Sequence, residues 1–247
     1  MLTQGQLQTF ARQGWVVVPD VVPAEALAAA NAAVDAMIAA DPPPATTTGP
    51  HFYWPTPTPP HPLLSALLDT PARGMTEALV SPLQLGEPEQ VQVSLNIPPH
   101  PNIPGGPHVD GLTPTEPDGR PGTFTMLAGI FLTDQTERSS GNLWVWPGTH
   151  LGAGRWLAEH GADALTGIVA AGDSYPPIDL PEPEQVVGAA GSLLFAHYLL
   201  AHNIGNNDSS AVRRCLYYRL RTTGHRADWK AHVTDPLVEF APVREAL

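Results

Sequence analysis

Three metal-binding side chains and one arginine occur at spacings that suggest a single site. His108 and Asp110 are separated by one residue, and His202 follows Asp110 by 92 residues. Arg213 comes 11 residues after His202. Two imidazoles and one carboxylate are the ligand set of a non-haem Fe(II) site with open positions for a co-substrate and O₂. Since an arginine can hold the far carboxylate of a dicarboxylate ligand through two hydrogen bonds, the set predicts an iron site with such a co-substrate.

The H-x-D pattern has a geometric reason to bind one ion. On an extended segment, residues i and i+2 point to the same face, so His108 and Asp110 can converge. By itself the pattern is common, and a surface histidine beside a loop aspartate explains it more often. The surroundings of His202 make it a stronger candidate for a metal ligand. The apolar run 193–200 precedes it, and Arg213 begins the next expected strand.

Four further polar residues are candidates for supporting roles. Gln92 and Asn96 lie on one face of an expected strand, where they would bind the co-substrate or substrate, or simply satisfy backbone groups. His150 ends the turn 146–150 and is expected to be a structural hydrogen-bond partner. For His197 we expect packing, or a contact to a ligand side chain, because the triad is complete without it.

Helices are expected mainly in the N-terminal part of the chain. Thr3 is a suitable N-cap and Gly14 a suitable stop, which predicts a helix from Thr3 to Gln13. Pro23 opens an alanine-rich helix that ends near residue 40, and residues 63–79 form another. The stretch 41–62, rich in proline and threonine, is either a linker or an active-site flap.

The rest of the chain has the pattern of short strands. They are expected at residues 15–19, 90–97, 123–132, 141–146, 192–195 and 213–220, with a helical excursion at 151–165. Strands separated by turns, with helices at the N-terminal end, indicate a mainly β fold with flanking helices, as in a sandwich or jelly roll. We expect one domain over 1–247, with the helical segment of about 1–80 packed on the β core.

Four segments, in order, resemble one known family. The segment from Thr3 to Met37 is similar to the N-terminal region of the phytanoyl-CoA dioxygenase family, a branch of the Fe(II)/2-oxoglutarate oxygenases. Three further regions resemble signature regions of that family. They are GPHVDG at 106–111, GNLWVWPGTH at 141–150 and GSLLFAHYLLAHNIGNNDSSAVRRCLYYRL at 191–220.

The resemblance implies a double-stranded β-helix (a cupin-like jelly roll), Fe(II) as cofactor, and 2-oxoglutarate and O₂ as co-substrates. It implies that His108, Asp110 and His202 are the iron ligands and that Arg213 binds the distal carboxylate of 2-oxoglutarate. Related halogenases have a small residue where this chain has Asp110, so hydroxylation is favoured over halogenation. Arg214 is expected to face the other way, because neighbouring strand residues alternate.

The composition argues against some classes of binding partner and indicates a cellular compartment. With 12 basic and 24 acidic residues the net charge is −12, which argues against nucleic acid or an anionic membrane as partner. No apolar run reaches the roughly 18 residues of a membrane span, and the first residues do not resemble a secretory signal. The single cysteine, Cys215, is expected to be a buried structural thiol, which suits the cytoplasm.

The substrate is the least defined part of the prediction. A coenzyme A ligand favours a basic patch, so a small natural-product or amino-acid-like molecule is preferred over an acyl-CoA. Five aromatic residues suggest an aromatic-lined mouth, with burial in the core as the alternative: Tyr53, Trp54, Trp144, Trp146 and Trp156. Two other classes stay open: a non-enzymatic jelly-roll binding module and a cupin-like metalloenzyme that does not use 2-oxoglutarate.

Overall fold

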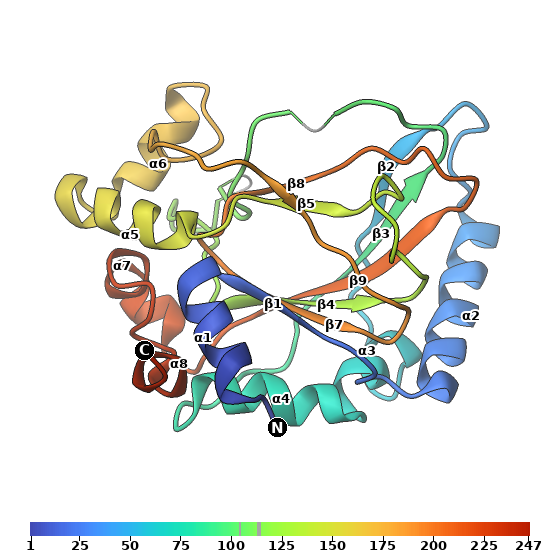
Figure 1. The fold of residues 1–247 in the computed structure, drawn as a ribbon, viewed down its shortest axis with the longest axis horizontal. Helices are drawn as coiled ribbons and strands as arrows, with labels where there is room; N and C mark the ends of the chain where they lie inside the picture. Colours follow the sequence, from blue (N-terminus) through green and yellow to red (C-terminus); the bar gives the residue numbers. More distant parts are fainter. Residues whose placement is uncertain (104, 113–114) are drawn as a thin grey trace.

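Two antiparallel sheets form the centre of the computed structural model, which describes residues 1–103, 105–112 and 115–247 (Figure 1). The larger sheet has the order β1-β7-β4-β9-β3-β2, and the smaller has the order β6-β5-β8. The strands are β1 (Trp15–Val18), β2 (Gly49–Tyr53), β3 (Val91–Ile97), β4 (Met126–Phe131), β5 (Leu143–Val145), β6 (Glu184–Gln185), β7 (Leu193–His197), β8 (His202–Ile204) and β9 (Arg213–Leu220). The predicted mainly β, jelly-roll-like core with flanking helices is confirmed.

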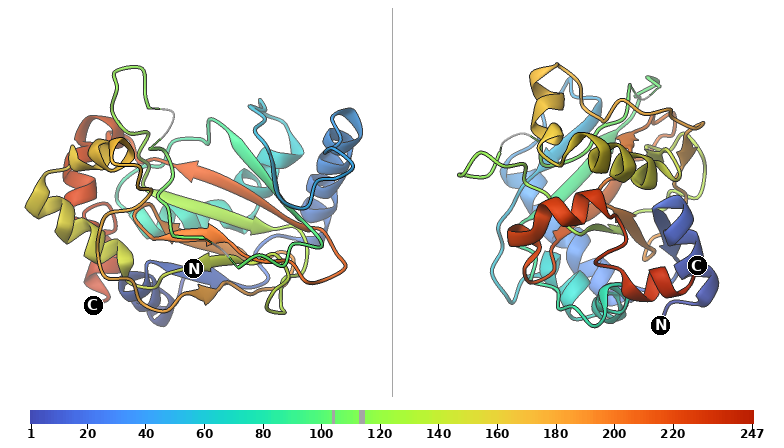
Figure 2. Two further views of the ribbon diagram at one scale, coloured as in Figure 1. Left: turned by 90° about the horizontal axis from the view of Figure 1, so that it is seen from above. Right: turned by 90° about the vertical axis from the view of Figure 1, so that its left-hand side faces the viewer.

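Helices surround this core at both ends and on one face (Figures 1 and 2). They are α1 (Gln4–Gln13), α2 (Ala24–Ala40), α3 (Pro62–Leu68), α4 (Pro71–Val80), α5 (Thr149–His160), α6 (Ala164–Ala170), α7 (His225–Thr234) and α8 (Ala241–Glu245). Figure 1 shows α5 to α8 at one end of the sheets and α2 at the other. No helix in the described ranges is both long enough and apolar enough to cross a membrane.

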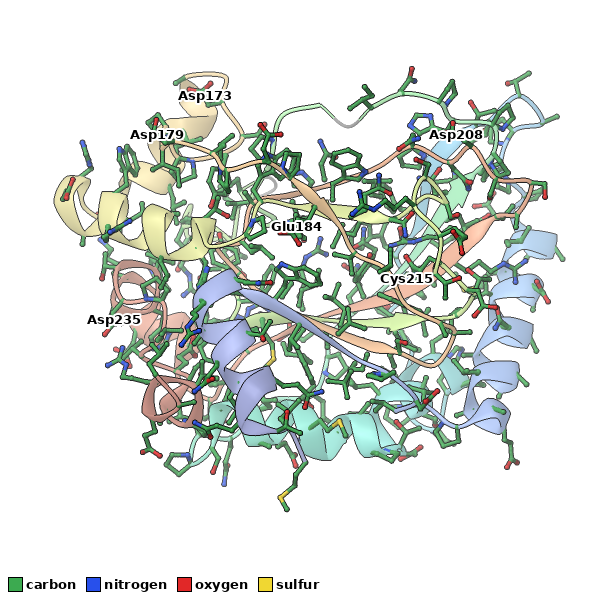
Figure 3. All side chains as sticks on the ribbon, viewed as in Figure 1. Asp173, Asp179, Glu184, Asp208, Cys215 and Asp235 are labelled. Atoms are coloured by element: carbon green, nitrogen blue, oxygen red, sulfur yellow. The ribbon has the colours of Figure 1, made fainter. Side chains whose placement is uncertain are left out.

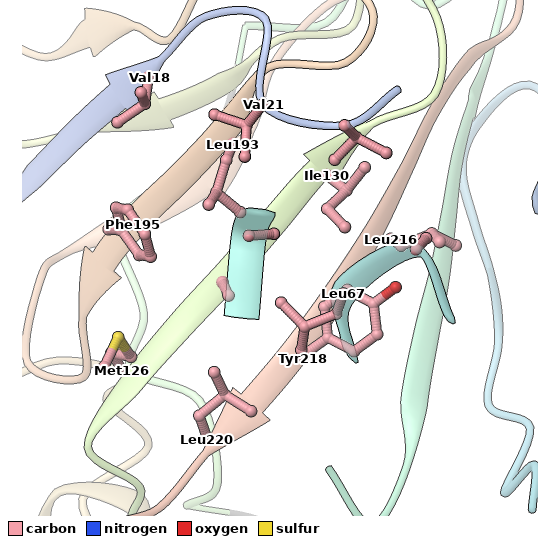
Figure 4. Close-up of a cluster of buried hydrophobic side chains, with 14 of the residues drawn as sticks. Val18, Val21, Leu67, Met126, Ile130, Leu193, Phe195, Leu216, Tyr218 and Leu220 are labelled. Carbon is pink, nitrogen blue, oxygen red and sulfur yellow. The ribbon is translucent and has the colours of Figure 1, made fainter. Parts of the chain in front are cut away.

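Strand β9 shows how alternation divides the core. Leu216, Tyr218 and Leu220 point away from the smaller sheet and pack in the apolar cluster that contains α3 and α4 (Figure 4). The Tyr218 hydroxyl also donates to the Leu63 carbonyl oxygen at 2.6 Å. The residues between them face the opposite side, toward the space between the sheets. Alternate residues of β9 therefore face opposite ways. Apolar side chains pack against the helices, and polar ones face the space between the two sheets.

The N-terminal helices follow local signals closely, with one exception. Thr3 and Gln6 form a capping box at the start of α1, and Gly14 ends the helix with φ 81°. The single helix predicted over 63–79 is wrong, because the chain forms α3 and α4 there. Pro71 has no N–H and disfavours a helical residue before it, so Thr70 leaves the helix and caps α4 by accepting from the Ala72 N–H.

The stretch 41–62 contains a strand rather than a linker. Residues 49–53 form β2, which pairs with β3 at the edge of the larger sheet. The Tyr53 hydroxyl donates to the Asp41 carbonyl oxygen at 2.6 Å, which ties the segment back to the end of α2. The segment therefore occupies a fixed place beside β3, the strand that precedes His108.

Candidate functional site

His108, Asp110 and His202 meet where the loop after β3 crosses the start of β8. The backbones of His108 and His202 form an antiparallel bridge, with His108 N–H donating to His202 O at 3.1 Å. His108 Nε2 lies 3.7 Å from Asp110 Oδ1, and His202 Nε2 lies 3.9 Å from Asp110 Oδ2. His108 and His202, 94 positions apart in sequence, are thus held together by main-chain hydrogen bonds.

Both histidines place a ring nitrogen near this point. His202 Nδ1–H donates to the Leu200 carbonyl oxygen at 2.9 Å, so the other ring nitrogen, Nε2, is the one that faces Asp110. Burial, helped by the neighbouring His202, lowers the pKa of His108 to about 4. His108 is therefore neutral at pH 7, which is the form that binds a metal ion.

Asp110 is held in place by a glycine turn and by an arginine. Gly111 has φ 74°, and a Cβ there would lie 2.2 Å from the Gly122 carbonyl oxygen, so only glycine fits after the aspartate. Arg219 Nη2 and Nε lie 3.0 and 3.3 Å from Asp110 Oδ2. Burial alone would raise the pKa of Asp110, but His202 and Arg219 outweigh it and hold that pKa below its usual value. The group is a carboxylate at neutral pH.

The Arg219 guanidinium is itself fixed by aromatic rings. Its Cζ lies 4.8 Å from the centre of the Trp54 ring and 5.9 Å from that of Phe124. A guanidinium over an aromatic face is attracted by the ring quadrupole. Arg219 thus links the segment 49–54 to the aspartate, a connection that our sequence-based reasoning missed.

Arg213 is the largest fully buried side chain and is 1% exposed. Its guanidinium donates to Gln135 Oε1 at 3.2 Å, to Ser94 Oγ at 3.1 Å and to the Tyr217 hydroxyl at 2.5 Å. None of these partners is an acid, and no carboxylate of the described residues forms an ion pair with it. A buried cation without a counter-charge is costly, which is a reason to expect an anionic ligand there.

A cavity of about 780 Å³ lies beside the three ligand residues and Arg219, whereas Arg213 does not itself line it. The ligand side chains His108, Asp110 and His202 open into it, together with Tyr217, the partner of Arg213. Phe52 and Trp54 line it from the edge strand and the residue after it. The wall also carries Gln92, Leu127, Leu143, Asn203, Arg219 and Arg221. The space suits a small organic molecule above a metal ion.

The arrangement fits a divalent metal and an anionic co-substrate. Three donors on one ion at about 2.1 Å lie roughly 3 Å apart. The two histidine–Asp110 distances, 3.7 and 3.9 Å, therefore need to close by less than about 1 Å. Gln135 Nε2, on the amide that bonds Arg213, is buried without a hydrogen-bond partner. An unpaired buried donor beside an unpaired buried cation is what a bound carboxylate would satisfy.

Comparison with known proteins decides the family. The family model for phytanoyl-CoA dioxygenase matches residues 10–215. The chain belongs to the phytanoyl-CoA dioxygenase family. The recognition made from the sequence is confirmed, although no curated protein matched the chain. Since the match ends at residue 215, Tyr217, Arg219 and helices α7 and α8 lie beyond it.

Several solved structures share this fold at low sequence identity. HygX from Streptomyces hygroscopicus, solved with nickel and 2-oxoglutarate bound, has 18% identity, covers 90% of this chain and 88% of its own, and gives a TM-score of 0.62. AviO1 from Streptomyces viridochromogenes has 17% identity, coverages of 90% and 96%, and a TM-score of 0.59. SnoK, a non-haem α-ketoglutarate-dependent carbocyclase from nogalamycin biosynthesis, has 19% identity, coverages of 90% and 85%, and a TM-score of 0.56. Identities this low show a shared fold only.

The two amides expected near the co-substrate have different positions in this family member. Gln92 pairs with Tyr217 across the β3–β9 ladder and lines the cavity. Asn96 pairs with Arg213 in the same ladder but does not line the cavity. Its Nδ2 donates to the Gly205 carbonyl oxygen at 2.8 Å, so it satisfies the backbone, the second of the two roles expected for it.

The remaining candidates lie away from the site. His150 Nε2 lies 3.2 Å from the Ala11 carbonyl oxygen, and His197 lies between the Leu199 N–H and the Pro236 carbonyl oxygen. Cys215 is fully buried within the strands (Figure 3), and burial raises the pKa of its thiol to about 11. Arg214 faces outward and pairs with Asp35 at 2.7 Å. These positions agree with the structural roles expected for them.

The expected aromatic mouth is largely wrong. Of the five residues named, only Trp54 lines the cavity; the other four are Tyr53, Trp144, Trp146 and Trp156. Trp146 is 7% exposed in the core, and Trp156 stacks on His160 with ring centres 4.4 Å apart. Phe52, two residues before Trp54, also lines the cavity.

Proposed function

We propose that this protein is an Fe(II)- and 2-oxoglutarate-dependent oxygenase that oxidises a C–H bond of a small molecule. The observation that carries the proposal is a two-histidine, one-carboxylate cluster on a cavity whose wall includes Tyr217, and the Tyr217 hydroxyl accepts from a buried arginine, Arg213, that has no acidic partner among the described residues. Family membership supports it, and so does the presence of nickel and 2-oxoglutarate in the structure of HygX.

Each residue has a defined task in this scheme. His108, Asp110 and His202 hold the iron, and Arg219 keeps the carboxylate of Asp110 aimed at it. Arg213 neutralises the distal carboxylate of 2-oxoglutarate, with Ser94 and Tyr217 keeping the guanidinium in place. Bound together, iron, 2-oxoglutarate and O₂ supply a two-electron oxidation of the substrate and release succinate and CO₂. The protein orients the C–H bond and limits water.

Asp110 favours hydroxylation, or another oxidation without halogen transfer, as the outcome. Its carboxylate is ionised and lies 3.7 and 3.9 Å from the two histidine nitrogens, so it occupies the place that a halide would need. The fold also serves other outcomes, since SnoK is a carbocyclase. The product therefore depends on how the substrate lies in the cavity.

The substrate we favour is a natural-product or amino-acid-like molecule. A cavity of about 780 Å³ with Phe52 and Trp54 on one wall and Gln92 and Asn203 on others offers apolar and polar contacts together. HygX has been solved with hygromycin B bound, which shows a polar natural product on this fold. We place the activity in one domain over 1–247, with about 1–80 packed on the β core, in the cytoplasm.

The test is co-substrate turnover by the iron-loaded protein in air. Slow formation of succinate from 2-oxoglutarate, accelerated by one member of a natural-product and amino-acid panel, is the expected result. No succinate above the level of free iron would favour the non-enzymatic binding module. Arg213→Ala separates the third class, because a metalloenzyme that does not use 2-oxoglutarate keeps its activity when the arginine is removed.

A further inference from the structure

A second group of metal-binding side chains lies at the C-terminal end of the chain. His225, His232 and Glu239, called here the C-terminal cluster, bring two Nδ1 atoms and one carboxylate oxygen together. His225 Nδ1 lies 2.9 Å from Glu239 Oε2 and 3.1 Å from His232 Nδ1, and His232 Nδ1 lies 3.5 Å from the same oxygen. Three donors on one tetrahedral zinc ion are about 3.3 Å apart, so the triangle already has the required size.

Neighbouring hydroxyls orient the Glu239 carboxylate and the His225 ring so that the three atoms face one another. The hydroxyls of Thr125 and Thr222 both donate to Glu239 Oε1, the first at 2.8 Å, which turns Oε2 toward the histidines. His225 Nε2 lies 3.0 Å from the Thr123 hydroxyl. A histidine that donates its far N–H to such an oxygen presents the other nitrogen as a metal ligand. The Thr125 hydroxyl also lies 3.2 Å from His225 Nδ1.

The cluster is buried and separate from the iron-site residues. His225 is 1% exposed and Glu239 is 4% exposed, whereas the side chain of His232 keeps 15% of its surface. None of the three lines the cavity of the first site. All three follow residue 215, where the match to the family model ends, so family membership does not account for them.

Regular spacing brings the cluster together. His225 and His232 are seven residues apart at the two ends of α7, and Glu239 follows seven residues later, just before α8. Positions i and i+7 share one face of a helix. Asp228 interrupts the regular helix with φ −106°. The pattern H-x₆-H-x₆-E is the sequence signal that our reasoning from the sequence overlooked.

We infer that the C-terminal cluster is a second metal site, which binds a divalent transition-metal ion with the ligand preference of zinc. Two imidazoles and one carboxylate are typical zinc donors, and water completes the coordination on the side where His232 is exposed. The threonines that support the site flank β4 and β9, so the ion fastens α7 and the segment before α8 to the ends of these strands, and β9 also carries Arg213 and Arg219.

Zinc binding to a protein that lacks the first site tests this inference. The double variant Asp110→Ala/His202→Ala removes the iron site, and folding is checked by circular dichroism. After equilibrium dialysis against zinc, we expect about one ion per chain by elemental analysis. Adding His232→Ala should lower zinc affinity by at least about 100-fold, whereas adding His160→Ala, an exposed histidine in α5, should not change it.

Two further readouts keep the result decisive if a variant folds poorly. Cobalt in place of zinc in the double variant should give the intense visible bands of a tetrahedral site, and zinc should raise its melting temperature. A folded double variant that binds no zinc, or binds it equally well after His232→Ala, would overturn the inference. The three residues would then form a hydrogen-bonded network only.

Discussion

Two clusters of two histidines and one acid in this chain differ in where they face. In the first, the side chain of His108 is 37% exposed and the cluster opens into the cavity. In the C-terminal cluster, His225 and Glu239 are almost fully buried, and the ligand atoms lie closer together. Two histidines and one acid can thus form a cluster that is open to a cavity or one that is closed off from solvent.

The supporting contacts differ in the same sense. Asp110 is held by a cation, Arg219, which is in turn fixed on Trp54 in the cavity wall. Glu239 is held by the neutral hydroxyls of Thr125 and Thr222 inside the protein. An open metal position next to a cavity supports chemistry, whereas a closed one supports stability. We therefore expect variants of the first cluster to change activity and variants of the second to change folding.

The largest effect is expected from removing an iron ligand. His202→Ala takes away one of three donors and should reduce iron-dependent succinate formation by more than about 100-fold, beyond the 10–100-fold typical of supporting residues. Elemental analysis should show a matching loss of bound iron. His160→Ala, far along α5, serves as the control, and equal activity in both variants would remove His202 from the site.

Arg213→Ala should weaken 2-oxoglutarate binding without releasing iron. Breaking a buried hydrogen-bonded ion pair costs at least about 2 kcal/mol, which is roughly a 30-fold rise in the dissociation constant. Isothermal titration of the iron-free or nickel-loaded protein measures it. Arg214→Ala is the matched control on the outer face of the same strand. Unchanged affinity after Arg213→Ala would place the co-substrate elsewhere.

The free energy of unfolding should distinguish the roles of the two clusters most directly. Glu239→Ala leaves the Thr125 and Thr222 hydroxyls and His225 without their acceptor, and we expect a loss of about 2 kcal/mol in the free energy of unfolding. Asp110→Ala should lose less, because its carboxylate opens into the cavity and its partner Arg219 keeps its contact with the Trp54 ring. Urea unfolding of the metal-free proteins gives both values. The reverse order would contradict the assignment of roles.

The smallest effect concerns the residue that orients Asp110. Arg219→Met removes a hydrogen bond and an ion-pair contact to Oδ2 and should raise the dissociation constant for iron by about 10-fold, the lower end for a contact behind a metal ligand. Competition with a chelator measures the change. Arg226→Met, an exposed arginine paired with Glu89, is the control. Iron affinity equal to that of the control would reduce Arg219 to a packing role.

The parts of this fold that local rules govern could be predicted from the sequence. Thr3, Gly14 and the alternation in β9 place a helix and a two-faced strand without long-range information. The convergence of Asp110 and His202 was predicted from spacing and resemblance, and in the structure His202 Nε2 lies 3.9 Å from Asp110 Oδ2. Arg213 was expected beside the co-substrate, and its burial without an acidic partner adds a physical reason.

What could not be predicted depends on contacts between distant residues. Arg219 meets Asp110 across 109 positions, and nothing near either residue signals that pair. The edge strand β2 was not predicted, because the stretch 41–62 is rich in proline and proline is rare in sheet interiors. At the edge of a sheet, where β2 lies, proline is tolerated. The burial of Trp146 follows from packing against the rest of the core, which composition does not reveal.

The absorption spectrum of the anaerobic protein tests the central claim most directly. Adding 2-oxoglutarate to the Fe(II)-loaded protein should produce a weak visible charge-transfer band, which forms only when the keto acid chelates the iron. The band should saturate at one 2-oxoglutarate per chain in the wild type and require much higher concentrations in Arg213→Ala. A wild-type protein that binds iron through His108, Asp110 and His202 yet shows no band at saturating 2-oxoglutarate would contradict the account.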